Sequence, residues 1–169
     1  MVELKVVDVR IDDTTKTPFV ELRALDGTRR ILPIFIGIAE ASAIKHGLEE
    51  RVTPRPLTHD LVSLVIDAIG AKLEQVVITE FRQKTFYAEM HLGVGGDRRV
   101  VSCRPSDAIA VAVRRKVQVY ANDAVLDECA VPDLAVEVGG LLESGDAEHL
   151  FDEFRRFIDD IDPEDFKKA

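Results

Sequence analysis

The spacing of hydrophobic residues changes twice along the first half of the chain. Before Gly37, three runs of alternating apolar and polar residues are separated by turn-forming residues. This pattern predicts three strands joined as a meander. After Gly37 the apolar residues recur every three or four positions, a spacing typical of a helix that ends near Glu50. Two prolines then interrupt the helix, and Thr58 can cap a second helix that runs to Ile69, before Gly70. The three strands are predicted at Glu3–Asp12, Pro18–Ala24 and Arg29–Phe35.

The same order of elements begins again after Gly70. Three further strand-like runs are followed by an apolar helix over Ser106–Lys116, whose basic last turn suits the negative end of the helix dipole, and by a short strand at Val117–Ala121. The glycine-rich stretch Gly93–Asp97 resembles a phosphate-binding loop, but strands flank it on both sides, so a hairpin turn is predicted there. The three strands cover Lys72–Phe81, Thr85–Val94 and Arg98–Cys103.

These elements predict an α+β fold over residues 1–130, built from two related strand-strand-strand-helix halves. Their strands form a mixed, largely antiparallel sheet covered by helices. The segments around Phe19 and Phe86 align in order, and so do Glu40 and Asp107, which favours an internal duplication. Any two meanders that precede a helix can also be aligned by chance. If the duplication is real, a pseudo-twofold axis places Glu40 and Asp107 in equivalent positions.

Residues 131–169 form a separate acidic segment that contains one strong hydrophobic pattern. A glycine-containing linker precedes an amphipathic C-terminal helix, and the apolar stripe of that helix has to be buried. The stripe can pack on its own core, on a second subunit or on another protein, and a homodimer or higher homo-oligomer is the expected assembly. It consists of Leu150, Phe151, Phe154, Phe157, Ile158 and Ile161.

The net charge of −9 is concentrated in this tail. Residues 1–121 carry 18 Lys and Arg against 16 Asp and Glu, a balance of +2, whereas residues 122–169 carry 4 against 15, a balance of −11. The core is therefore permissive for a phosphate-containing ligand, although it lacks the basic surface of a dedicated nucleic-acid binder. No apolar run is long enough to cross a membrane and no secretory leader precedes the first strand, so a cytoplasmic protein without a membrane partner is expected.

Two short clusters combine an arginine, a proline and an acid at a helix start. They are Arg55–Asp60 and Arg104–Asp107. The free N–H groups and partial positive charge of a helix N-terminus, with a guanidinium nearby, suit a phosphate or another anion. Asp60 and Asp107 either cap the helices and pair with the arginines, or hold a divalent cation that bridges to phosphate.

His59 is the best-placed side chain for proton transfer, because imidazole exchanges a proton near neutral pH and an acid adjoins it. The alternative is a capping or packed imidazole. Ser106 can act as a nucleophile only if a base reaches it. The chain has no Walker loop, no HExxH, no GxSxG elbow, no EF-hand loop and no zinc-finger spacing, which excludes most enzyme classes with clear motifs.

Several segments together resemble the bifunctional nuclease domain family, over roughly residues 1–130. The resemblance implies a nuclease that degrades DNA and RNA. Ser102 stands where family members often carry an acid two positions before the arginine, which removes one candidate metal ligand or base. The segments are Leu32–Gly37 with Glu40, Ala41 and Ile44, then Arg55–Asp60, Phe86–Ala88 and Arg104–Ala110.

The first interpretation is a phosphodiesterase that acts on nucleic acid with the help of a divalent cation, Mg²⁺ or Mn²⁺. The alternative is a non-catalytic regulatory or protein-binding module in which the same clusters are structural caps. A third possibility combines the two: the acidic tail competes with nucleic acid, so truncation at about residue 130 strengthens binding. The candidate residues are His59, Asp60, Ser106 and Asp107 for catalysis, Arg55 and Arg104 for phosphate, and Glu40, Asp60 and Asp107 for the cation.

Overall fold

The computed structural model describes residues 1–133, in which Met1–Pro132 form one compact unit. The predicted C-terminal amphipathic helix lies outside the described residues. The first half contains β1 (Val2–Ile11), β2 (Pro18–Ala24), β3 (Arg30–Phe35), α1 (Ile38–Leu48) and α2 (Thr58–Ala68). The second half contains β4 (Ala71–Arg82), β5 (Thr85–Val94), β6 (Asp97–Cys103), α3 (Pro105–Arg115), β7 (Val119–Ala121), α4 (Asp123–Cys129) and β8 (Val131–Pro132).

The eight strands of residues 1–133 belong to one sheet, in the order β6-β5-β4-β7-β1-β2-β3-β8. Every neighbouring pair is antiparallel except β4 and β7, which are parallel. The predicted α+β class and the mixed, largely antiparallel sheet are therefore confirmed. Each predicted meander remains together on its own side of the short strand β7.

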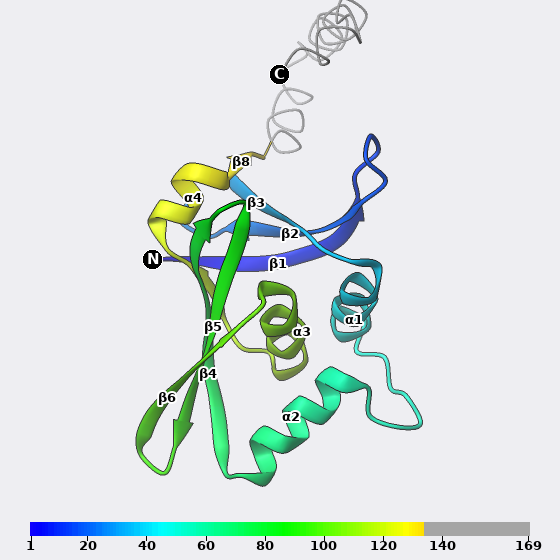
Figure 1. Ribbon diagram of the computed structural model, residues 1–169, viewed down its shortest axis with the longest axis vertical. Helices are drawn as coiled ribbons and strands as arrows, with labels where there is room; N and C mark the ends of the chain where they lie inside the picture. The colour runs from blue at the N-terminus through cyan, green and yellow to red at the C-terminus, as the bar shows by residue number, and fades with distance from the viewer. Residues whose placement is uncertain (134–169) are drawn as a thin grey trace, which may run out of the picture. The chain divides into compact units, whose positions relative to one another are not determined.

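The order of the strands has the symmetry that an internal duplication requires. Strand β7 is antiparallel to β1 and parallel to β4, so β1 and β4 run in opposite directions on its two sides. A twofold axis through β7 would exchange the two meanders in this way. The helices that follow them, α1 and α3, pack against each other, which brings the starts of both helices to the same region of the molecule (Figure 1).

The core forms around α3, whose centre is inaccessible to solvent. The five residues from Ala108 to Ala112 are each no more than 1% exposed, as the unbroken apolar run predicted. Leu22 and Leu32 from the first meander, Leu73 and Ile78 from the second, and Ile44 of α1 are also fully buried and belong to the same core. A single hydrophobic core therefore joins the two halves.

The segment after β7 contains two elements that hydrophobic spacing did not predict. Helix α4 has 7 residues, and β8 has 2 residues that pair with Arg30 and Ile31 of β3. Both elements are shorter than the window in which a periodic pattern can be recognised. Their ordering depends on contacts with the sheet rather than on a local signal.

Two hairpin turns require positive φ angles. Gly95 (φ 58°) and Gly96 (φ 93°) connect β5 to β6, which confirms a hairpin turn in place of a phosphate loop. Between β4 and β5 the same backbone is adopted by Gln83 (φ 52°) and Lys84 (φ 60°). Positive φ at both central residues is typical of a type I′ turn, for which Asn-Gly is favoured. Gln83 and Lys84 therefore adopt an energetically unfavourable backbone.

Helix α2 buries very little of its apolar surface. Ile66 is its only buried residue, and its charged side chains make ion pairs with α3. The helix is attached largely through these polar contacts, which leaves an apolar face at the surface. That face consists of Leu57, Leu61, Leu64, Val65 and Ile69. Within residues 1–133, no helix is long and apolar enough to span a membrane.

The close contact of α1 with α3 depends on Gly47. A Cβ atom at this position would lie 2.5 Å from Val113 Cγ2 and 2.9 Å from Arg114 Nη1. In an unconstrained helix, replacing Gly with Ala stabilises by about 1 kcal/mol. Overpacking costs about 1–3 kcal/mol. We therefore expect Gly47→Ala to lower the free energy of unfolding by about 1 kcal/mol, measured by urea denaturation.

A double-mutant cycle separates this packing effect from helix propensity. In a Val113→Ala background the nearest clashing methyl is absent and only the contact with Arg114 Nη1 remains, so the loss of stability caused by Gly47→Ala should become smaller. An equal loss of stability in both backgrounds would contradict the proposed clash.

Candidate functional site

Arg104 joins the starts of α1 and α3. It precedes α3, and its Nη1 donates to Glu40 Oε1, in the first turn of α1, at 3.0 Å. Its Nε and Nη2 donate to the two carboxylate oxygens of Asp107, in the first turn of α3, at 2.9 and 3.1 Å. The guanidinium therefore holds one carboxylate in a bidentate pair and a second from the other half of the molecule.

His59 contacts the same carboxylate from α2. Its Nε2 lies 3.3 Å from Asp107 Oδ1, and its side chain is only 14% exposed. Burial raises the pKa of Asp107, but hydrogen bonds from Arg104 and His59 outweigh it and hold that pKa below its ordinary value. Asp107 is therefore ionised at neutral pH and can orient both side chains.

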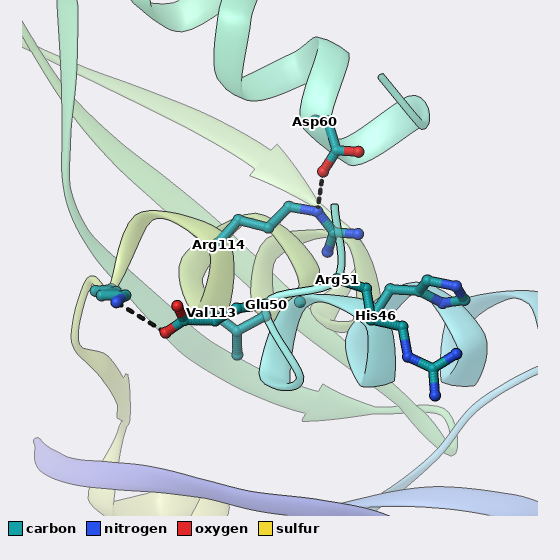
Figure 2. Close-up of a pocket in the computed structure, with 8 residues that line it drawn as sticks. His46, Glu50, Arg51, Asp60, Val113 and Arg114 are labelled. Atoms are coloured by element: carbon teal, nitrogen blue, oxygen red, sulfur yellow. Dashed lines mark hydrogen bonds and ion pairs between the residues drawn. The ribbon is translucent and has the colours of Figure 1, made fainter. Parts of the chain in front are cut away.

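Asp60 lies next to His59 in sequence but faces a different partner. Its Oδ2 accepts the backbone N–H of Leu57 at 2.9 Å and caps α2, while its Oδ1 accepts from Arg114 Nε at 2.5 Å. Burial raises the pKa of Asp60, but these hydrogen bonds outweigh it and lower the pKa overall. Figure 2 shows the pair beside a cavity of about 280 Å³ whose walls include His46, Glu50 and Arg51.

The structure does not join Arg55 or Ser106 to these contacts. Arg55 is exposed in the loop before α2 and makes no ion pair with any residue of the described chain. Ser106 is buried, and within residues 1–133 no hydrogen bond links its hydroxyl to a histidine or a carboxylate. The nucleophile hypothesis for Ser106 therefore has no base in contact with it.

The three acids predicted to hold a cation do not form a preformed metal centre. In the described part of the chain no group of three or more His, Cys, Asp or Glu side chains is arranged to hold a metal ion. Glu40 and Asp107 converge on Arg104, whereas Asp60 is engaged by Arg114. Two carboxylates are therefore close to each other, and the third belongs to a separate ion pair.

A second cavity of about 280 Å³ opens beside Arg104 and Glu40. Its walls include Phe35, Lys84 and Phe86, which sequence reasoning did not assign to the site. Phe35 and Phe86 lie within segments that carry the family resemblance, but nothing in the sequence distinguishes them from core residues. The other residues that line it are Ile34, Ile36, Gly37, Thr85, Pro105 and Ser106.

Comparison with known proteins identifies the family. The family model described as the bifunctional nuclease domain matches residues 20–133. This chain belongs to the bifunctional nuclease domain family. It is 38% identical over 170 residues to an uncharacterized protein of Mycobacterium tuberculosis H37Rv, with 99% of each chain covered.

Two plant relatives carry the family name as their own. Bifunctional nuclease 1 of Oryza sativa subsp. japonica is 27% identical over 117 residues, and Bifunctional nuclease 1 of Arabidopsis thaliana is 29% identical over 115 residues. These matches cover 68% and 66% of this chain but only 35% of each plant protein. This chain therefore shares the nuclease domain with much longer proteins.

The Asp60–Arg114 pair should stabilise the attachment of α2 to α3. Arg114 has a side chain only 10% exposed, so Asp60→Asn leaves a largely buried cation without its carboxylate. We expect the free energy of unfolding to fall by about 1–3 kcal/mol at pH 7. Asp67→Asn, at the more exposed pair with Arg115, serves as the control and should cost less than about 1 kcal/mol.

The effect of Asp60→Asn should disappear in acid. The folded-state pKa of Asp60 lies below the ordinary value of 3.8, so its stabilisation is fully present above pH 3.8 and is lost as the pH falls through the folded-state pKa. The unfolding curves of wild type and Asp60→Asn, measured from pH 7 downward, should therefore converge below pH 3.8. A difference that stays constant through this range would exclude the ion pair as its cause.

Proposed function

We propose that this protein is a nuclease that hydrolyses phosphodiester bonds in DNA or RNA. Membership of the bifunctional nuclease domain family supports this proposal. The observation that carries it is the contact of His59 with Asp107 beside the guanidinium of Arg104. A general base, the carboxylate that orients it and a cation suited to phosphate then lie together at the start of α3.

His59 is proposed to accept the proton of the attacking water. When Nε2 donates to Asp107, the lone pair is on Nδ1, the ring nitrogen that does not face Asp107. The water oxygen attacks phosphorus as its proton passes to Nδ1, and the bond from phosphorus to the leaving oxygen breaks. The leaving oxygen keeps the bonding electron pair and takes a proton from the solvent. Asp107 stabilises the imidazolium that forms, because its lowered pKa keeps it ionised.

Arg104 is proposed to hold the phosphate on which this reaction occurs. Its side chain is two-thirds exposed, so one of its donors can be transferred from a carboxylate to a phosphate oxygen. Arg55, exposed in the loop before α2, is proposed as a second phosphate contact along the strand.

A divalent cation would enter this site together with the substrate. Mg²⁺ is commonly held by one or two carboxylates plus substrate phosphate rather than by a complete protein cage. Glu40 and Asp107 are the residues proposed to hold it, and it would polarise the phosphate oxygens. Asp60 is not included, because Arg114 and the α2 cap occupy its oxygens.

One observation favours a non-catalytic binding module instead. Arg104 already satisfies both Glu40 and Asp107, so the cluster is complete as a structural link among α1, α2 and α3. In this alternative, substitutions at Asp107 or His59 lower stability without removing any activity. A nuclease therefore predicts variants that stay folded but do not cleave, whereas a binding module predicts variants that lose only stability.

Cleavage of single-stranded DNA and RNA, with and without Mg²⁺ or Mn²⁺, should require His59 and Asp107. General acid-base catalysis is typically worth about 10²–10⁴-fold, so we expect His59→Ala and Asp107→Asn to lower the cleavage rate by at least about a hundredfold. Asp67→Asn is the matched control, because it removes a carboxylate of α2 outside the cluster. Its rate should equal that of wild type.

Thermal unfolding measured on the same preparations shows whether each variant is folded. Equal cleavage by wild type, His59→Ala and Asp107→Asn would remove this site from consideration. Cleavage by none of them, under any of the cation conditions, would favour the binding module.

A further inference from the structure

Two cross-strand pairs of phenylalanines flank the cavity beside Arg104. Phe35 of β3 lies opposite Phe19 of β2, with ring centroids 5.6 Å apart. Phe86 of β5 lies opposite Phe81 of β4, with ring centroids 4.6 Å apart. Phe35 and Phe86 line the cavity. Each of these two rings therefore contacts a second ring on the neighbouring strand.

The ring of Phe35 is not buried by this arrangement. Phe35 is 54% exposed, although it ends a strand whose inward residues Leu32 and Ile34 are almost completely buried. An aromatic ring that is fixed by its neighbours and open to solvent loses little conformational entropy when a flat ligand stacks on it. The cavity therefore offers a ready surface for a planar aromatic group.

Lys84 provides a positive charge at the same cavity, in a turn that is unfavourable for its own backbone. It occupies the positive-φ position between β4 and β5 where glycine would be preferred, and it makes no ion pair with any residue between 1 and 133. Arg104 lines the cavity as well. Two cationic side chains are thus placed beside two aromatic rings.

We propose that this cavity binds one unpaired nucleobase of a single-stranded nucleic acid. The base stacks on Phe35 and Phe86, and the adjoining phosphate lies near Lys84 and Arg104. This inference rests on the proposed nuclease function, because that function makes the cavity a substrate subsite. It specifies a single-stranded nucleic acid as the substrate class. A base paired within a duplex is stacked on its neighbours and has to be unstacked before it can enter.

The charge of the core supports recognition through the base rather than through the backbone. Residues 1–121 have a balance of only +2, and Arg104, which lines the cavity, is already ion-paired with Glu40 and Asp107. Stacking on aromatic side chains tolerates any base, because every base has a π face. Single-stranded DNA and RNA therefore both fit this cavity, and the affinity should depend only weakly on salt.

The test is a binding titration of the full chain in EDTA, followed by fluorescence anisotropy. Three labelled probes are compared: a single strand, the same strand without bases, and the same strand in a duplex. Because stacking is worth about 1–3 kcal/mol per base, we expect the strand without bases to bind at least about tenfold more weakly. The duplex should bind more weakly as well.

The variants assign this preference to Phe35. Phe35→Ala should weaken binding of the single strand about tenfold and leave binding of the strand without bases unchanged, whereas Phe35→Tyr keeps the ring and should restore binding. Leu25→Ala is the matched control, because Leu25 is equally exposed, at 54%, and lies outside the cavity. Lys84→Asn keeps a residue that tolerates positive φ and removes the charge, so it should reduce the salt slope by about 0.7.

Equal affinity for strands with and without bases would overturn the nucleobase cavity, even if the protein cleaves nucleic acid. Base-dependent binding that is lost in Phe35→Ala and restored in Phe35→Tyr would support the cavity. This second outcome, without cleavage under any cation condition, would leave the cavity standing and remove the nuclease proposal. The two proposals therefore fail independently.

Discussion

The structure depends on the burial of α3 and on the arginines at its two ends. The centre of the helix is apolar on every side, so neighbouring elements can pack all around it. Arg104 at its start reaches Glu40 of α1, while Arg114 near its end reaches the carbonyl of Ala43 in α1 and the carboxylate of Asp60 in α2. Arg115 donates to Asp67 in α2. The same helix therefore organises the core through its middle, and it holds α1 and α2 through its ends.

The polar chemistry of the site follows from this arrangement. A helix start has N–H groups without intrahelical partners, so acids such as Glu40 and Asp107 are favourable there. When the two meanders place α1 and α3 side by side, the two carboxylates approach each other. A positively charged side chain between them offsets their mutual repulsion. Arg104 supplies this positive charge, and His59 of α2 contacts Asp107 as well, through Oδ1.

The sequence was sufficient to predict those parts of the structure that local patterns determine. Alternating residues located the first six strands, and the pairing of Arg104 with Asp107 follows from three residues at one helix start. The partner of Asp60 could not be found in this way, because Arg114 lies 54 positions away in the sequence. The interaction of the basic last turn with the helix dipole also gave Arg114 a sufficient role without a carboxylate partner. Phe35 could not be found either, since the sequence does not distinguish this exposed ring from a core residue.

Asp107 links the stability of the fold to the chemistry of the site. Its carboxylate accepts from Arg104 and contacts His59, so one group both fixes a helix start and orients the proposed base. Asp60 performs the structural part of this task alone, next to Arg114 and away from the cavity that Phe35 lines. The two acids follow arginine and proline in similar segments, yet only Asp107 is paired with Arg104, which lines the cavity of Phe35 and Phe86. Position in the assembled fold, rather than the local motif, therefore distinguishes the carboxylate proposed to orient His59 from the structural one.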